Sequence, residues 1–281
     1  LKLLPPSRVR CCCFLQIYAL VVMGNSPCCS DSGGEFAEVL SRSTLDQASE
    51  QPYYYEDGAS YVGQFQAKKR HGEGKMTWPD GAKYFGQWHE DTAHGRGRFE
   101  HTNGDVYEGE MKHDRAHGQG VYQAADGLRY EGQWEDDKRH GTATETWADG
   151  SSFQGQYVAG KRQGKGSFSW ADGSHYSGQF VDNSIQGKGV YQWSDGRMFD
   201  GDWQNSKMHG AGVFAWPDGR RYEGGYQCDV KEGEGVFTWA DGRRYQGQWK
   251  DGKQHGRGVY TRANGEKRRG EWAAGQPLPE R

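Results

Sequence analysis

The chain has little of what usually holds a globular protein together. Only 33% of its 281 residues are hydrophobic, and its longest apolar stretch, CCCFLQIYALVVM at residues 11–23, is too short to cross a bilayer. The formal net charge of −3 also lacks the strong positive balance of a nucleic-acid-binding domain. These absences argue against an ordinary aliphatic core, a membrane-spanning helix and a nucleic-acid partner.

Cysteine is nearly absent from the body of the chain. Five of the six cysteines lie within the first 29 residues, and only Cys228 lies further on. This distribution cannot staple a fold with disulfides, and no CxxC or Cys/His spacing suggests a zinc site. The body is therefore predicted to be reduced and cytosolic.

Glycine and aromatic residues are abundant instead. The chain has 44 Gly, 11 Trp, 16 Tyr and 11 Phe, although its mean hydropathy of −1.04 would by itself indicate disorder. So many rings are not expected in a solvated chain. The combination favours extended β-structure in which rings pack over glycines.

A repeat of 23 residues accounts for this composition. The stretch YVGQF at residue 61 returns without insertion as YFGQW, YEGEM, YEGQW, FQGQY, YSGQF, FDGDW, YEGGY and YQGQW, the last at residue 245. A partial tenth copy begins at Arg268, and half a unit, YEDGAS, precedes the first. The array is predicted to cover residues 53–276, followed by a short tail at 277–281.

Fixed glycines and turn residues divide each copy into two strands. Glycine stands at the third and twelfth positions throughout, and at the fourteenth except for Ala143. An Asp-Gly or Asn-Gly pair closes every complete copy, as at Asp80-Gly81, and predicts a hairpin turn whose two central residues both have positive φ. A second turn is predicted near the eighth position, as at Asp91.

Side chains alternate between the faces of a strand, so the ring and glycine positions share one face. The other face carries mostly polar residues. Glycine leaves room for a ring from a neighbouring strand to lie across its backbone.

The unit YQGQWKDGKQHGRGVYTRANG (245–265) resembles the MORN (membrane occupation and recognition nexus) repeat. The resemblance implies an all-β fold: an elongated, single-layer, twisted antiparallel β-meander, here preceded by a mostly irregular N-terminal segment. It also implies a role as scaffold, membrane tether or cytoskeletal adaptor. One copy departs from the pattern, with Ala143 in place of glycine and Glu145 in place of a ring, so the aromatic groove is expected to be interrupted there.

A single-layer sheet has no second layer to cover its rings, and soluble monomers rarely leave large apolar patches unused. We therefore expect a partner in the groove: a helix of another protein, or a second copy of this chain, which would make a homodimer. The rings predicted to line this groove are Tyr84, Trp88, Tyr107, Tyr130, Trp134, Tyr222, Tyr226, Phe237, Trp239, Tyr245 and Trp249.

Other recurrent residues are interpreted as structural. Histidine precedes the twelfth-position glycine in six copies, and Gln or Glu replaces it in the other three without disturbing the period. The Asp-Gly pairs lack the spacing of a calcium loop. Basic clusters such as Lys68-Lys69-Arg70 favour a solvated face that makes only weak, salt-sensitive contacts with anionic lipid. Neither metal nor cofactor is predicted.

The first 52 residues are unrelated to the repeat. MGNSPCCS, from Met23, resembles an acylation signal, with myristoylation at Gly24 and palmitoylation at Cys28 and Cys29. Residues 1–22 are then interpreted as an upstream extension and 23–52 as a targeting segment and linker. The alternative is a signal peptide over residues 1–23, which would direct the chain to secretion.

No nucleophile elbow, HExxH, Walker or kinase motif is present. We predict a non-enzymatic scaffold anchored on the cytoplasmic face of a membrane, either the plasma membrane or a cortical or ciliary structure. Two alternatives stay open. One is the lipid-sensing regulatory region of a phosphatidylinositol-phosphate kinase-like protein whose catalytic domain is absent here, and the other is a cytoskeletal or axonemal structural protein.

Overall fold

The computed structural model describes residues 51–279, which form 21 strands joined by turns and contain no helix. These residues divide into two compact units, and the division falls within β10 (Ser152–Val158). The N-terminal unit comprises residues 51–148 and 157–160, and the C-terminal unit comprises residues 149–156 and 161–279.

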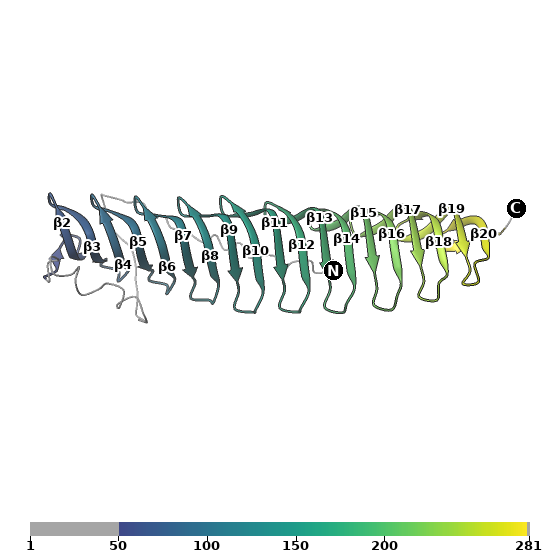
Figure 1. The fold of residues 1–281 in the computed structure, drawn as a ribbon, viewed down its shortest axis with the longest axis horizontal. Helices are drawn as coiled ribbons and strands as arrows, with labels where there is room; N and C mark the ends of the chain where they lie inside the picture. The colour runs from purple at the N-terminus through teal and green to yellow at the C-terminus, as the bar shows by residue number, and fades with distance from the viewer. Residues whose placement is uncertain (1–50, 280–281) are drawn as a thin grey trace. The chain divides into compact units, whose positions relative to one another are not determined.

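Strands of seven and nine residues alternate along each unit, except for the two-residue strands β1 and β21. Figure 1 labels the strands from β2 to β20 in chain order. The N-terminal unit contains β1 (Tyr53–Tyr54), β2 (Ser60–Gln66), β3 (Lys69–Thr77), β4 (Lys83–His89), β5 (Thr92–Glu100), β6 (Val106–Lys112), β7 (Arg115–Gln123), β8 (Arg129–Glu135) and β9 (Lys138–Thr146). The C-terminal unit contains β11 (Lys161–Ser169), β12 (His175–Val181), β13 (Ser184–Gln192), β14 (Met198–Gln204), β15 (Lys207–Ala215), β16 (Arg221–Gln227), β17 (Val230–Thr238), β18 (Arg244–Lys250), β19 (Lys253–Thr261), β20 (Lys267–Ala273) and β21 (Gln276–Pro277).

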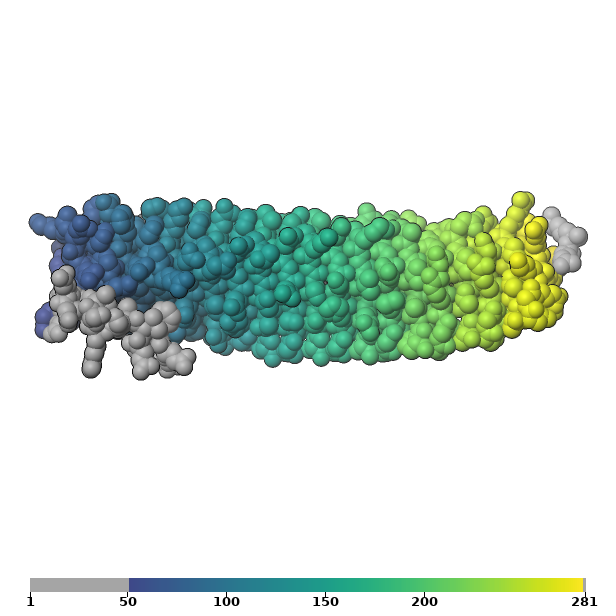
Figure 2. All heavy atoms as spheres, in the orientation of Figure 1, coloured from purple at the N-terminus to yellow at the C-terminus, as the bar shows by residue number. Residues whose placement is uncertain are grey.

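Within each unit, every strand pairs antiparallel with the next strand in sequence. Neighbours in sequence are therefore neighbours in space, and Figure 2 shows the residue colours following one another in bands within each unit. A β-bulge recurs once per repeat, as at Gly86/Trp88 between β4 and β5. The predicted all-β antiparallel meander is confirmed.

The two turns of each repeat differ in kind. The short turn at Ala67 and Lys68 has φ of 50° and 66°, the geometry of a two-residue type I′ hairpin. The other turn is a longer loop, which joins β3 to β4 and contains the Asp-Gly pair; we call it the long loop. In it only Gly81 has positive φ, 99°, while the Asp80 side chain accepts a hydrogen bond from Ala82 N at 2.9 Å. The prediction of positive φ at both residues of each Asp-Gly pair is therefore wrong, because the aspartate acts through its side chain.

Rings lie directly over glycines, as expected. A Cβ on Gly97 would lie 2.2 Å from the hydroxyl oxygen of Tyr84, on the neighbouring strand. That hydroxyl donates to Gln87 O at 3.1 Å, so the ring spans the glycine and is held at its far end. Glycine is required here for close approach, not for an unusual backbone conformation.

Aromatic rings of successive hairpins form the core. Trp88 packs edge-to-face on Tyr84 at 5.1 Å and on Tyr61 of the preceding repeat at 5.5 Å between ring centroids. Its indole N–H donates to Gly74 O at 3.2 Å. These contacts join each repeat to the one before it and bury the rings without a second layer.

A carboxylate or amide at the eighth position joins neighbouring hairpins. Ala116 N donates to Asp137 Oδ1 at 2.8 Å, and Arg162 N donates in the same way to Asn183 Oδ1 at 2.9 Å. Asp137 is 9% exposed, and this burial raises its pKa to about 6. An asparagine can therefore supply the same hydrogen bond without a buried charge.

The variant Asp137→Asn is expected to stabilise the folded chain at pH 7 by about 2 kcal/mol. The folded pKa of Asp137 lies above its unfolded value, so its ionisation removes stability as pH rises from about 4 to 6. Urea denaturation at pH 7 and at pH 4 tests this, because the gain should vanish at pH 4. An equal gain at both values would contradict the role given to the charge.

Candidate protein-binding face

Most rings predicted to line a groove are interior residues. Ten of the eleven are less than a tenth exposed, and only Trp239 is partly exposed. Tyr107, Tyr130, Tyr222 and Tyr245 are fully buried. These rings therefore form the interior of the aromatic face. The surface that a partner can reach is formed by other residues of the same face.

A continuous row of rings lies on this face in the C-terminal unit, and we call it the ring ladder. It alternates between the sixteenth and eighteenth positions of successive repeats, with neighbouring centroids between 4.4 and 5.9 Å apart. The sixteenth-position rings are buried up to β17, whereas the four tryptophans are partly exposed. The ladder consists of Phe168, Trp170, Tyr191, Trp193, Phe214, Trp216, Phe237, Trp239 and Tyr260.

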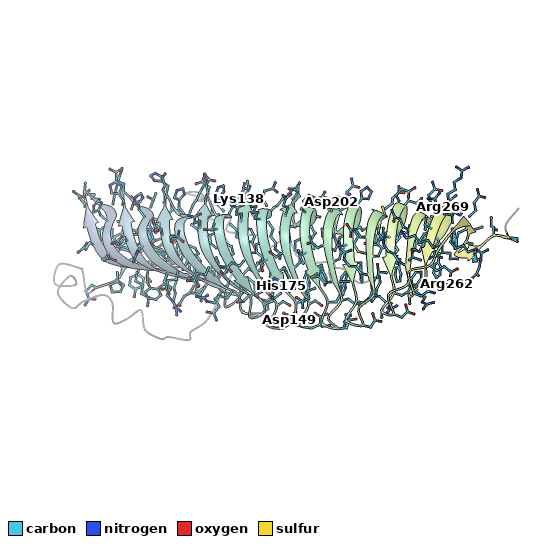
Figure 3. All side chains as sticks on the ribbon, turned by 45° about the vertical axis from the view of Figure 1, so that its right-hand side comes forward. Lys138, Asp149, His175, Asp202, Arg262 and Arg269 are labelled. Carbon is cyan, nitrogen blue, oxygen red and sulfur yellow. The ribbon has the colours of Figure 1, made fainter. Side chains whose placement is uncertain are left out.

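Each of three ladder tryptophans carries an arginine stacked on its ring. Arg220 lies 5.2 Å from the centroid of Trp216 and pairs with Asp218 at 2.7 Å. The same arrangement recurs around Trp193 and Trp239. Arg262 takes the tryptophan position in the last repeat. In Figure 3 it lies at the edge of the sheet that carries the long loops, away from Asp202. The edge therefore offers apolar ring surface bordered by neutralised arginines.

The sequence prediction named Trp239 but missed its equivalents Trp170, Trp193 and Trp216. Each of these tryptophans directly precedes the long loop, one residue beyond the end of a strand. A residue past the strand end has fewer neighbours to cover it. Position relative to the Asp-Gly loop was therefore the signal that separates partly exposed rings from buried ones.

The N-terminal unit has a corresponding but shorter row of rings. Trp78 contacts Phe99 at 5.3 Å and Phe99 contacts His101 at 4.4 Å, but Ala124 then takes the tryptophan position. Glu145, where a ring was expected, is 2% exposed within this face. The apolar row is thus broken by small and polar side chains before the C-terminal unit.

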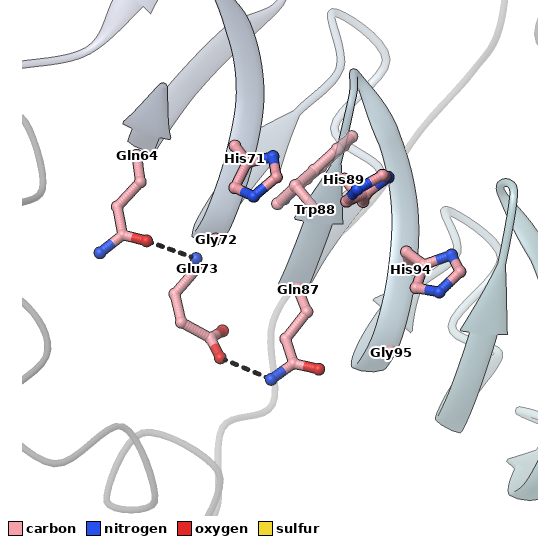
Figure 4. Close-up of a pocket in the computed structure, with 9 residues that line it drawn as sticks. All are labelled: Gln64, His71, Gly72, Glu73, Gln87, Trp88, His89, His94 and Gly95. Atoms are coloured by element: carbon pink, nitrogen blue, oxygen red, sulfur yellow. Dashed lines mark hydrogen bonds between the residues drawn. The ribbon is translucent and has the colours of Figure 1, made fainter. Parts of the chain in front are cut away.

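A row of imidazoles lies at the short-turn edge of the N-terminal unit. The centroids of His71 and His89 are 5.1 Å apart, and those of His89 and His94 are 5.8 Å apart, around a pocket of about 280 Å³ (Figure 4). Burial, followed by the neighbouring His113, His89 and Lys112, lowers the pKa of His94. Within residues 51–279, no three His, Cys, Asp or Glu side chains are arranged to hold a metal ion.

Carboxylates neutralise two residues of the basic cluster Lys68-Lys69-Arg70. Lys69 pairs with Glu90 at 3.5 Å, and Arg70 pairs with Asp91 at 3.4 Å. Ion pairs of this kind weaken the local positive potential that anionic lipid would meet. The predicted acylation sites Gly24, Cys28 and Cys29 lie outside the described residues. None of residues 51–279 belongs to a helix that is long and apolar enough to cross a membrane.

Comparison with solved structures gave matches of low sequence identity. The TCP domain of SAS-4 (dCPAP) from Drosophila melanogaster, solved with a proline-rich motif of Ana2 (dSTIL), is 13% identical, covers 63% of this chain and 90% of its own, and has a TM-score of 0.35. The TCP10 domain of Danio rerio CPAP is 13% identical, with coverages of 72% and 94% and a TM-score of 0.39. Virginiamycin B lyase from Staphylococcus aureus is 13% identical in one structure, with coverages of 81% and 70% and a TM-score of 0.15.

A search of curated proteins gave no match. The family profile described as the MORN repeat matches nine consecutive segments: 61–83, 84–106, 107–129, 130–152, 153–175, 176–196, 199–220, 222–243 and 245–267. These segments follow the 23-residue period and together cover most of the 281 residues. The hairpins with rings over glycines are the structural form of that repeat, and the chain belongs to the MORN-repeat family.

Proposed function

We propose that this chain is a non-enzymatic scaffold that binds a helical protein segment along the ring ladder of the C-terminal unit. The observation that carries the proposal is the row of four partly exposed tryptophans, at equivalent positions of successive repeats. They lie on a sheet face that no second layer of residues 51–279 covers. Tryptophan and stacked arginine are the residues most enriched at the energetic centres of protein interfaces.

Repeat spacing supports a helical occupant. Equivalent tryptophans are two strands apart, which corresponds to about 9.6 Å at the usual strand separation. Side chains seven residues apart on a helix are separated by about 10.5 Å along its axis. A helix with an apolar residue at every seventh position would place one such residue near each tryptophan.

The double variant Trp193→Ala, Trp216→Ala is expected to weaken capture of the partner by at least about tenfold, because each interface tryptophan contributes more than 1 kcal/mol in typical cases. The measurement is quantitative recovery of co-purifying proteins with the full chain. Glu223→Ala, Gln246→Ala is the matched control, because both residues are exposed on the opposite face.

Equal recovery with both double variants would contradict ladder binding. Sedimentation of the purified chain adds a second readout. A homodimer dissociated by the tryptophan variant would identify a second copy as the occupant in place of a helix from another protein.

We further propose that acylation at Gly24, Cys28 and Cys29 anchors this scaffold to a membrane. The support is the sequence MGNSPCCS alone, in which one myristoyl chain and neighbouring palmitates would give stable binding. Expressed from Met23, the chain should partition with membranes, and Gly24→Ala should shift most of it to the soluble fraction. Unchanged partitioning of this variant would refute myristoyl anchoring.

A further inference from the structure

The tenth residue of each repeat faces the aromatic side of the sheet, and in one copy it is a lysine. Lys231 of β17 lies opposite Tyr226 of β16, as judged by their α-carbons. Four other copies fill this position with apolar residues that are at most 5% exposed: Ala93, Ala116, Ile185 and Met208. The remaining four carry Arg70, Arg139, Arg162 and Gln254. Among the nine complete copies, this one alone places a primary ammonium at that position.

Four rings surround this ammonium, and we call them the aromatic cage. The Nζ atom lies 4.9 Å from the ring centroid of Phe237, 5.0 Å from that of Tyr222, 5.2 Å from that of Trp249 and 5.3 Å from that of Trp216. All four distances are within the range of a cation–π interaction. The residue as a whole is only partly buried.

The cage supplies no negative charge. Two other cations at the tenth position have a carboxylate: Arg70 pairs with Asp91 at 3.4 Å, and Arg139 pairs with Glu145. Arg162 lies over the rings of Phe153 and Phe168, 5.0 Å from each centroid. Within residues 51–279, the Nζ atom of Lys231 has neither a hydrogen-bond acceptor nor an ion-pair partner. Its three N–H donors therefore face ring surfaces, where they cannot form the hydrogen bonds that an ammonium makes in water.

Methyl groups on the nitrogen remove this mismatch. Methylation keeps the positive charge that the rings attract and replaces N–H donors with apolar surface. Aromatic cages are the usual sites that hold methylated ammonium groups. We propose that Lys231 is a site of N-methylation and that its di- or trimethylated side chain is the occupant for which the aromatic cage is suited.

The reaction requires a sulfonium methyl donor and an enzyme that supplies it. The lone pair of the neutral amine attacks the methyl carbon, the carbon–sulfur bond breaks, and the donor leaves as a neutral thioether. The new ammonium loses a proton to solvent before each further transfer, and the trimethylated nitrogen keeps a fixed positive charge.

The environment favours the nucleophilic form of Lys231. Burial, followed by the charge of Arg220, lowers its pKa to about 8. At pH 7 roughly one-tenth of such a side chain is neutral, about 200-fold more than for a lysine of ordinary pKa. This lysine therefore presents a free lone pair without an adjacent general base.

Mass spectrometry of the full chain, purified from the cells that express it, tests the proposal. Digestion should release the peptide around Lys231 carrying two or three methyl groups, while exposed lysines such as Lys250 and Lys253 in the same digest serve as references for unmodified chain. Recovery of this peptide solely without methyl groups would overturn the proposal.

A second measurement tests whether the cage accepts the product. Reductive methylation of the purified chain with formaldehyde and a borane should raise its thermal midpoint by about 3 °C relative to the Lys231→Arg chain treated in the same way. The arginine variant keeps the charge and all other lysines. An equal or lower midpoint in the treated wild-type chain would show that the cage does not favour a methylated ammonium and would refute the proposal.

Discussion

Replacing Arg139 by methionine is expected to destabilise the folded chain by about 3–5 kcal/mol. The substitution would leave the carboxylate of Glu145 buried in the aromatic face without its cation. A buried charge that loses its partner retains the full cost of desolvation, and this cost exceeds the value of the lost contact itself.

The structure shows how completely this pair is enclosed. Glu145 is 2% exposed and receives a hydrogen bond from the Arg139 guanidinium. Its other oxygen accepts from the Tyr157 hydroxyl at 2.5 Å. Arg139 also lies over the Tyr130 ring, 5.0 Å from the centroid. The methionine of the variant would fill most of the arginine's volume. The expected loss of stability would therefore come mainly from the unpaired charge and not from a cavity.

A double variant separates charge from packing. Arg139→Ala, Glu145→Phe reproduces the residues that the repeat at 84–106 has at the same positions, Ala93 and Phe99. An apolar replacement of a buried ion pair is often neutral or stabilising, although here the buried Tyr157 hydroxyl loses its acceptor. This chain is therefore expected to be clearly more stable than Arg139→Met.

Equilibrium denaturation of the wild type and both variants gives the comparison. A neutral Arg139→Met variant, or a double variant as unstable as the single one, would contradict a buried and mutually compensated pair.

Gly97→Ala is expected to cost about 3 kcal/mol of stability through overpacking. The added methyl group would lie 2.2 Å from the Tyr84 hydroxyl oxygen and 2.4 Å from its ring carbon Cζ. Tyr84 is 1% exposed and is held by its hydrogen bond to Gln87 O. The ring therefore has little room to move, and the strain is distributed over two neighbouring strands.

Ala143 provides the matched comparison, because it occupies the same repeat position naturally. In that copy Tyr130 keeps the corresponding bond, donating to Gln133 O at 2.8 Å. Ala143→Gly should therefore change the free energy of unfolding by less than about 1 kcal/mol, the usual cost of glycine in a strand. If thermal denaturation shows that Gly97→Ala destabilises the chain as little as Ala143→Gly does, the tyrosine rings can move to make room for a methyl group. The glycines would then not be required for ring packing.

The turns show where sequence reasoning reached its limit. Asp-Gly predicts a tight hairpin, and the reversal of the chain occurs at each such pair as expected. The type I′ turns instead occur at the short turns, including Ala67 and Lys68, which carry no strong turn signal. The register that places a turn depends on the pairing of both flanking strands, which a local dipeptide does not specify.

The buried ion pair and the aromatic cage also could not be predicted from short stretches of sequence. Glu145 was noticed as a missing ring, but its partner Arg139 lies six residues earlier in the same strand, a separation that a fully extended strand would place out of reach. Lys231 had no sequence feature to distinguish it, since its four rings come from positions up to 33 residues apart, from Trp216 to Trp249.

By itself, the sequence determined the period, the strand and turn order, and the sharing of one face by rings and glycines. These properties follow from local rules: alternation along a strand, and the freedom of glycine to admit a close neighbour. Only the tertiary structure decided which rings are accessible. Exposure depends on how far neighbouring strands cover each ring, and that coverage buries Tyr222 while leaving Trp193 and Trp216 partly open at the sheet edge.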